Sequence, residues 1–271
     1  MRTRVAASVF FSFALLWAAP ARAQYVPAES ASRATGENYH VEFGAYFWNP
    51  SPEIFITSES IPGVLGSRID FVEDLGIKKT THSQIKVVLR PGTKHKFRFE
   101  YTPIKYEAEG TIQRTVVFNG ITFPISLPVA SQLTWRAYRF GYEWDFLYKD
   151  RGFLGMVLEA KYTDIEATLT NVIDTEFVRA RGPIPAIGVI GRGYVTSNIS
   201  ITGEFGLFKL PDVDQDYSGQ YYDFDLYGTV NFTNNFGAQF GYRSLDLLIR
   251  VDNDEGDMKM KGFYFGGVAR F

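Results

Sequence analysis

Three histidines, His40, His82 and His95, are the side chains of this 271-residue sequence best suited to acid–base chemistry. The sequence contains no cysteine, which excludes a disulfide framework, thiolate-bound zinc, iron–sulfur ligation and cysteine catalysis. His82 stands next to Ser83, and hydrolases often combine these two residue types. Neighbours on a strand point to opposite faces, however, so this pair cannot act together directly. We therefore expect a protein that is not an enzyme, with no cofactor and no bound metal, and keep a hydrolase acting at His82 as an alternative.

Apolar and polar residues alternate with a period of two along much of the chain, and helical periodicity is scarce. This alternation predicts β-strands whose two faces meet different surroundings. The ten predicted strands cover residues 39–49, 80–90, 95–107, 131–146, 152–168, 183–196, 198–210, 220–233, 236–250 and 258–271.

The connections between these segments alternate between two kinds. Four are very short, at residues 90–94, 148–151, 196–198 and 233–235, whereas the others are longer or more polar, at residues 50–79, 108–130, 169–182, 211–219 and 252–257. A meander in water has no reason to alternate in this way, but a barrel with one end on each side of a membrane has. Within the second long connection, Asn119-Gly120 predicts an added hairpin that turns on a type I′ pair and lies outside the cell.

The phase of the alternation separates an apolar face from a polar face in each segment. After Gly152, for example, Leu154 and Leu158 share a face and oppose Glu159 and Lys161. Lipid offers no hydrogen-bond partners, so a lipid-facing row must be apolar, and only a closed sheet satisfies every backbone group. We predict an all-β fold, a closed antiparallel up-and-down transmembrane β-barrel of ten strands, with eight as the runner-up. A soluble exported β-barrel that carries a ligand is the alternative, because its strands would also alternate.

The first residues have the organisation of an export signal. Arg2 and Arg4 precede an apolar stretch at residues 6–19 that is short for a membrane span, and Ala21 and Ala23 provide the small residues that signal peptidase needs. Cleavage is expected directly after them.

The chain thus divides into a signal peptide at residues 1–23, a flexible lead at residues 24–38 that stays in the periplasm, and the barrel at residues 39–271. Without the three arginines of the first segment, 25 basic residues stand against 30 acidic ones, a net charge of −5. This balance argues against binding to nucleic acid.

The end of the chain carries a second signature. Phe263, Phe265 and Phe271 share one face of the last predicted strand, and the chain finishes on the third of them. Together with the export signal, the missing cysteines and the alternating strands, this ending resembles bacterial outer-membrane β-barrel proteins, including the small porin-like, opacity-type and outer-membrane-protein-A-like barrels. Those barrels usually have eight strands, so ten is a departure. The resemblance implies that these three phenylalanines form the signal read by the barrel-assembly machinery, and that the protein lies in the outer membrane in contact with lipid and lipopolysaccharide.

Charged residues on the inward faces of the predicted strands are the candidate functional set. Seven are acidic and seven are basic, and in a confined interior charges must pair or attract water. The balance leaves two interpretations open: a salt-bridged filling of the lumen in a structural protein with surface-exposed loops, or a narrow porin-like constriction that selects small solutes. The predicted lumen set is Glu42, Lys86, Arg98, Glu100, Arg139, Glu143, Glu159, Lys161, Arg192, Glu204, Asp223, Asp225, Arg243 and Arg270.

Overall fold

The computed structural model describes residues 34–58, 66–210, 217–251 and 254–271. They belong to one compact unit that covers Ser32–Phe271. The predicted signal peptide and residues 24–33 of the predicted lead lie outside the described residues. No helix long and apolar enough to cross a membrane occurs in the described ranges.

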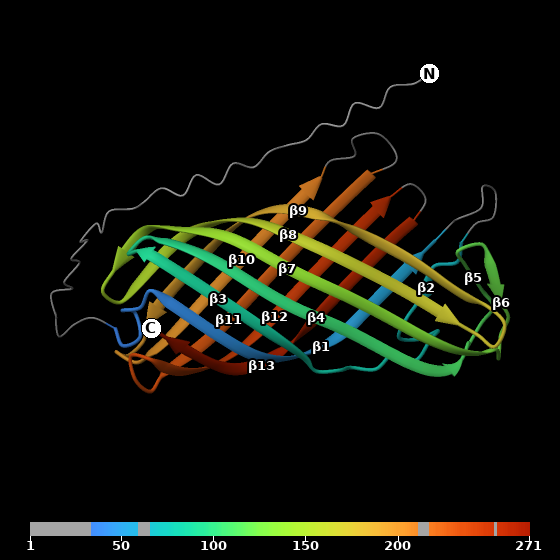
Figure 1. Cartoon of the computed structure of the whole chain (residues 1–271), viewed down its shortest axis with the longest axis horizontal. Helices are drawn as coiled ribbons and strands as arrows, with labels where there is room; N and C mark the ends of the chain where they lie inside the picture. Colours follow the sequence, from blue (N-terminus) through green and yellow to red (C-terminus); the bar gives the residue numbers. More distant parts are fainter. Residues whose placement is uncertain (1–33, 59–65, 211–216, 252–253) are drawn as a thin grey trace, which may run out of the picture. The chain divides into compact units, whose positions relative to one another are not determined.

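Ten long strands form a closed antiparallel barrel in which each strand pairs with its neighbours in the sequence (Figure 1). The first and last strands pair with each other, from Glu42 opposite Arg270 to Thr57 opposite Glu255, and this pairing closes the ring. The prediction of a ten-stranded up-and-down barrel is therefore confirmed, and the eight-stranded runner-up is not. The ten strands are β1 (Val41–Thr57), β3 (His82–Gly92), β4 (His95–Thr111), β7 (Pro128–Lys149), β8 (Gly152–Thr170), β9 (Thr175–Tyr194), β10 (Ile199–Leu210), β11 (Tyr217–Asn231), β12 (Phe236–Val251) and β13 (Asp254–Arg270).

The two ends of the barrel differ. At one end, here the turn end, tight connections join β3 to β4, β7 to β8, β9 to β10 and β11 to β12, and the last residue, Phe271, lies there against Val41. At the other end, the loop end, residues 58–81 connect β1 to β3 and residues 112–127 connect β4 to β7.

The strands extend further toward the loop end than the alternation predicts. Residues 169–182 and 252–257 are predicted to be connections, but most of the described residues in these two ranges belong to strands. The connection between β8 and β9 consists of residues 171–174 alone. The physical reason is that the outward row there carries polar residues such as Arg179 and Arg181, which are exposed. Hydrophobicity does not distinguish the two faces of such a strand. The period-two pattern therefore disappears from the sequence, although the backbone pairing continues.

A belt of exposed apolar side chains surrounds the barrel between its two ends. Phe47, Phe265 and Phe240 face one another across paired strands and are 52%, 59% and 61% exposed. In water such a belt would be strongly unfavourable, whereas hydrocarbon solvates it. The outward orientation of the apolar rows is thus the one predicted for a transmembrane barrel, and it does not fit the soluble alternative.

Tyrosines mark the edge of this belt on the side of the loop end. Tyr101 stacks on Tyr138 with ring centroids 4.8 Å apart, and Tyr138 lies 6.4 Å from Tyr162. Two residues beyond them, the outward positions hold Arg136 and Asp164. Aromatic rings followed by charges are typical of the boundary between hydrocarbon and water, so we call these three residues the tyrosine girdle.

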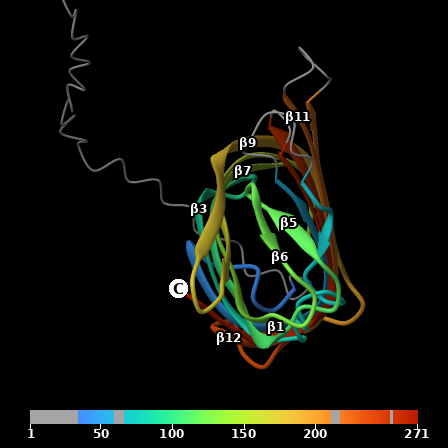
Figure 2. The same ribbon diagram turned by 90° about the vertical axis from the view of Figure 1, so that its right-hand side faces the viewer.

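The predicted hairpin forms but does not project from the barrel. β5 (Val116–Phe118) and β6 (Ile121–Phe123) turn at Asn119 and Gly120, whose φ angles of 48° and 80° are those of a type I′ turn. Val116, Phe118 and Phe123 are fully buried in one apolar cluster with inward residues of the barrel. Figure 2 views the loop end and shows the hairpin within the ring of strands.

A second inserted segment follows the short strand β2 (Ile69–Asp70), which pairs with β1. Ile69 and Phe71 are fully buried in the same cluster as the hairpin. The expected external hairpin is therefore part of a plug in the loop end, because its own apolar side chains favour burial over exposure to water.

If hydrocarbon surrounds the belt, Phe240→Arg should destabilise the protein by about 2–4 kcal/mol, the cost of an arginine near the middle of a bilayer. The control Ile173→Arg lies in the turn between β8 and β9, where the isoleucine is 88% exposed, and should change the stability little. Urea unfolding in lipid vesicles measures both. Equal effects of the two substitutions would contradict a lipid-facing belt.

Candidate functional site

The turn-end half of the barrel interior is filled with charged side chains. The structure places all fourteen members of the predicted lumen set there, twelve of them buried, while Lys86 and Asp225 are half-buried. Four further charged residues that the sequence analysis did not select are buried among them, namely Glu37, Arg90, Lys96 and Asp145. The interior set grows from seven to nine of each sign and stays electrically neutral.

Asp223 on β11 lies at the centre of this network. Its carboxylate accepts hydrogen bonds from Arg139 at 2.6 Å and from two nitrogens of Arg243 at 3.1 and 2.9 Å. Lys161 at 3.4 Å and the hydroxyl of Tyr221 at 3.0 Å also donate to it. A carboxylate with this many donors stays ionised, and it holds together side chains from four strands.

The two arginines at Asp223 reach other carboxylates as well. Arg243 donates to Glu100 at 2.6 Å, and Arg139 lies 3.3 Å from the same carboxylate. Arg139 also lies 3.0 Å from Glu159 and 3.5 Å from Glu204. No single ion pair can therefore be removed without leaving another buried charge short of a partner.

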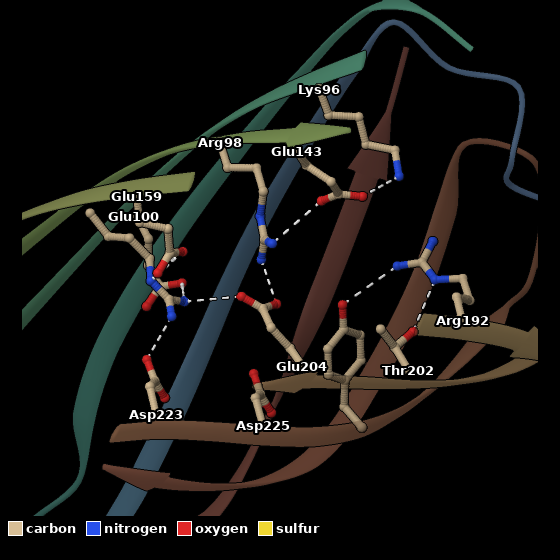
Figure 3. Close-up of polar contacts among 12 residues, drawn as sticks. Lys96, Arg98, Glu100, Glu143, Glu159, Arg192, Thr202, Glu204, Asp223 and Asp225 are labelled. Atoms are coloured by element: carbon tan, nitrogen blue, oxygen red, sulfur yellow. Dashed lines mark hydrogen bonds and ion pairs between the residues drawn. The ribbon is translucent and has the colours of Figure 1, made fainter. Parts of the chain in front are cut away.

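A second line of ion pairs continues from Glu204 toward the turn end (Figure 3). Arg98 donates to Glu204 at 2.6 Å and lies 3.4 Å from Glu143. Lys96 in turn donates to Glu143 at 2.5 Å and contacts Asp145 at 2.9 Å. Four of these residues lie on the neighbouring strands β4 and β7, so most of the line follows one wall, and the pair between Arg98 and Glu204 of β10 carries it across the interior.

Residues just before β1 close the turn end from inside. Glu37 pairs with Arg192 at 2.8 Å, and its backbone carbonyl accepts a hydrogen bond from Arg90 at 2.5 Å. Burial raises the pKa of the Glu37 carboxyl, but the charges of Arg192, Lys96 and Arg90 outweigh this effect and lower the pKa to about 2 from the usual 4.5. The expected flexible lead at residues 24–38 thus differs from the structure in its described part, since residues 34–38 are anchored within the barrel.

The remaining members of the predicted set lie at the edges of the network. Arg270 donates to Glu42 and to Asn231, both at 2.6 Å. Asp225 accepts a hydrogen bond from the hydroxyl of Tyr264 at 2.9 Å, and the ammonium group of Lys86 lies 5.8 Å from the ring centre of Tyr227.

The loop-end half of the interior is apolar, which the sequence analysis did not anticipate. On one side, inward residues of β1, β4 and β7 such as Ile54, Ile104 and Leu133 pack against the plug. On the other side a cavity of about 570 Å³ remains between β8, β9, β10, β11, β12, β13 and β1, and we call it the apolar chamber. A cavity of only about 30 Å³, enough for roughly one water molecule, lies between Trp48 and the charges of Glu100, Arg139 and Lys161.

The three histidines are dispersed. His82 is buried, its Nε2 has no hydrogen-bond partner among the described residues, and its ring packs edge-on against Tyr106 at 4.8 Å. His95 and the hydroxyl of Tyr142 lie 2.6 Å apart, and His40 contacts the backbone carbonyl of Arg90 at 3.2 Å. Among the described residues, no nucleophile or carboxylate is hydrogen-bonded to His82, so this geometry gives no support to a hydrolase acting at His82. In that same part of the chain no group of three or more potential ligands is placed to hold a metal ion.

The last strand places its phenylalanines as the alternation predicts. Phe263, Phe265 and Phe271 all point outward and are 58%, 59% and 67% exposed. Phe263 and Phe265 form the β13 part of the apolar belt, and Phe271 follows directly after this strand.

A closed barrel with an apolar outer belt, an aromatic girdle and a polar filling defines the class of bacterial outer-membrane β-barrel proteins. No model of a known protein family matches the sequence, and no curated protein matches it. The solved structures similar to it include the outer membrane protease OmpT of Escherichia coli, which is 9% identical, covers 88% of this chain and 98% of its own, and has a TM-score of 0.55.

Two further similar structures are outer-membrane barrels. The attachment invasion locus protein Ail of Yersinia pestis is 8% identical over 84% of this chain and 99% of its own, with a TM-score of 0.39. The toluene transporter TodX of Pseudomonas putida is 8% identical over 86% of this chain and 90% of its own, with a TM-score of 0.37. The closed barrel that the chain shares with OmpT is the fold of the bacterial outer-membrane β-barrels.

The central position of Asp223 makes it the most sensitive member of the network. Asp223→Asn removes the negative charge that Arg139, Arg243 and Lys161 share. Because buried positive charges then lack a partner, this substitution should destabilise the protein by about 3–5 kcal/mol. Asp257→Asn breaks an exposed pair with Arg68 and should cost no more than about 1 kcal/mol. Urea unfolding of the refolded variants tests this difference, and equal losses would contradict a central role for Asp223.

The anchoring of Glu37 predicts a pH dependence. Because its pKa is lower in the folded state, the stability that its charge contributes is fully present above the unfolded pKa of 4.5 and is lost as the pH falls through about 2. The shift corresponds to about 3 kcal/mol. Wild type and Glu37→Gln should therefore differ in the free energy of unfolding by about that much near neutral pH and converge in acid. A difference that stays constant down to about pH 2 would show that Glu37 is not held by these cations.

Proposed function

We propose that this protein is an integral outer-membrane barrel with a structural role, whose lumen is sealed to solutes by the ion-pair network and whose loop end is exposed at the cell surface. The observation that carries the proposal is the network itself. Nine charges of each sign fill the turn-end half, and the central ones bridge strands from different parts of the ring.

The orientation of the barrel follows from its two ends. Short turns and long loops are typical of the periplasmic and the outer side of such barrels, respectively. With the turn end in the periplasm, residues 34–38 cover the periplasmic end of the lumen, and the plug of β5 and β6 occupies the outer mouth. Lipopolysaccharide would then contact the tyrosine girdle and the charges beyond it, such as Arg136 and Arg179.

The porin-like interpretation requires a water path between the ion pairs. Opening one would separate charges such as Arg98 and Glu204, which lie 2.6 Å apart and are buried, and an unpaired buried charge costs several kcal/mol. A sealed lumen is therefore the better supported reading. OmpT is a protease, but a likeness at 9% identity concerns the fold and gives no activity to this chain.

The assembly of the barrel is part of the same proposal. The outward row of Phe263, Phe265 and Phe271 remains accessible on β13, and we propose that the barrel-assembly machinery reads it. The closing pairs between β1 and β13 would then form last, since these are the two ends of the barrel segment.

Planar-bilayer recording on the refolded protein tests the sealed lumen. Wild type should show no steady single-channel conductance, because the network leaves no continuous water path. The double variant Arg98→Ala/Glu204→Ala removes this cross-lumen pair and its contacts to Glu143 and Arg139 without changing the net charge, and serves as the control that identifies the route of any current. Steady wild-type conductance that changes in this double variant would overturn the proposal, since the current would then pass through the lumen.

A further inference from the structure

Among the residues that the structure describes, the wall of the barrel is incomplete beside β9. The ladder between β8 and β9 runs from Gly152 opposite Gly193 to Thr170 opposite Thr175, the full length of both strands. The ladder between β9 and β10 stops where Leu207 meets Ile187. Residues 175–186 therefore have no strand partner on their second edge in the described part of the chain. Figure 1 shows β8 and β9 continuing past the end of β10.

Two prolines mark the unpaired edge. Pro183 and Pro185 are two residues apart, so their missing N–H groups belong to the same edge of β9. The ladder with β8 continues through both of them, opposite Tyr162 and Ala160, whereas the ladder with β10 ends two residues beyond Pro185. Proline inside a sheet is largely confined to edge strands, so the sequence of β9 itself favours a gap here, which we call the lateral opening.

The lateral opening leads into the apolar chamber. Phe208 and Leu210 of β10 lie at the opening, and Ile165, Ile184, Leu247 and Met258 line the chamber behind it. Its volume of about 570 Å³ falls within the range of 300–1,000 Å³ that is typical of small-ligand sites. The lining is predominantly apolar, so the chamber suits a hydrocarbon group rather than a sugar or an ion.

The lateral opening lies at the level of the membrane boundary. Pro183 pairs with Tyr162, a member of the tyrosine girdle, while Ile187 and Val189 below it remain in the apolar belt. Unpaired backbone groups are not tolerated in the hydrocarbon region. The ladder between β9 and β10 agrees with this rule, because it ends only where the apolar belt ends. A molecule with its polar group at the membrane surface therefore meets the opening at the right depth.

Three arginines line the chamber, and one of them can serve such a polar group. Arg179 is held by Asp164 through two hydrogen bonds at 2.7 and 2.6 Å, and Arg250 pairs with Glu255. Arg181 also lines the chamber and is exposed; it lies opposite Asp164 in the ladder between β8 and β9 but makes no direct ion pair with any residue that the structure describes. The rim thus offers a guanidinium group beside an apolar cavity.

We propose that the apolar chamber binds the hydrocarbon chain of an anionic amphiphile, which enters through the lateral opening between β9 and β10 and leaves its charged group at Arg181. Such a chain could belong to a free single-chain amphiphile or to a membrane lipid, and the chemistry recognised is the same. This inference does not depend on the sealed lumen, because the chamber lies on the loop-end side of the ion-pair network.

Two glycines allow the chamber to be filled without disturbing its walls. A Cβ atom built on Gly182 or Gly256 meets no atom within 4 Å, and both residues line the chamber. Gly110 of β4 is equally open to a side chain but does not line it. Gly182→Phe and Gly256→Phe are therefore the test variants, and Gly110→Phe is their matched control.

The test is equilibrium dialysis of 11-bromoundecanoate against the full-length protein in uncharged detergent micelles, with protein-free micelles as the background. We expect saturable binding of one molecule per barrel, at least tenfold weaker binding to Gly182→Phe and Gly256→Phe, and binding within a factor of two of wild type for Gly110→Phe. Urea unfolding verifies that each variant is folded. Absence of saturable binding to wild type, or equal binding by the filled variants, would overturn the proposal.

The role of Arg181 and the source of the chain are tested in the same assay. Arg181→Gln should weaken the binding of the carboxylate severalfold and leave the binding of the uncharged 11-bromoundecanol unchanged. An equal effect on both would contradict the proposed contact between the charged group and Arg181. Displacement of the bound carboxylate by a diacyl phosphatidylglycerol would assign the chamber to a membrane lipid, and a failure to displace it would assign the chamber to a free amphiphile.

Discussion

The absence of hydrogen-bond partners in hydrocarbon is the constraint on which this structure depends. Every backbone N–H and C=O within the apolar belt must find its partner in a neighbouring strand, and the pairing of β1 with β13 is what makes this possible for a finite sheet. Among the described residues, the two long unpaired edges, residues 175–186 of β9 and residues 102–111 of β4, both begin where the belt ends. The constraint thus determines both where the wall is continuous and where a gap in it is tolerated.

The two halves of the barrel interior are filled in different ways. Ten strands enclose a space that side chains can fill, and the turn-end half is filled with charges whose cost of burial is offset by mutual pairing. The loop-end half is filled on one side by the apolar plug that carries Phe71 and Phe118. The same barrel therefore combines a polar, neutral layer within the apolar belt with an apolar chamber next to the tyrosine girdle, where the outward side chains become polar.

Much of the fold could be predicted because lipid imposes a regular pattern. Alternation along segments such as Gly152–Thr170 separated outward from inward residues and located all ten strands. It could not locate strand ends beyond the tyrosine girdle, where both faces carry polar residues and hydrophobicity no longer distinguishes them. The plug could not be predicted either, since the turn at Asn119 and Gly120 specifies a hairpin but not the surface on which it packs.

The sequence could predict which charged residues of the strands point into the lumen, but not the residues and the cavity that surround them. Lys96 stands two residues before Arg98 and shares its inward face, so the alternation contained the signal for it. Glu37 precedes the first strand, and no periodicity marks a residue that folds back into the lumen. The apolar chamber had one local signal, the paired prolines at 183 and 185, whose meaning becomes clear only when the neighbouring ladder is known to stop there.

The central claim is that the two faces of each strand meet hydrocarbon and a closed interior, and spin labels along β8 test it most directly. Since the chain contains no cysteine, each single-cysteine variant from Leu154 to Tyr162 carries one label. In lipid vesicles, collision with oxygen should be frequent at even positions and rare at odd ones, and a water-soluble nickel complex should reach neither set. Access of the nickel complex to the inward position Val157, which lies outside the ion-pair network, would reveal a hydrated lumen and contradict the account.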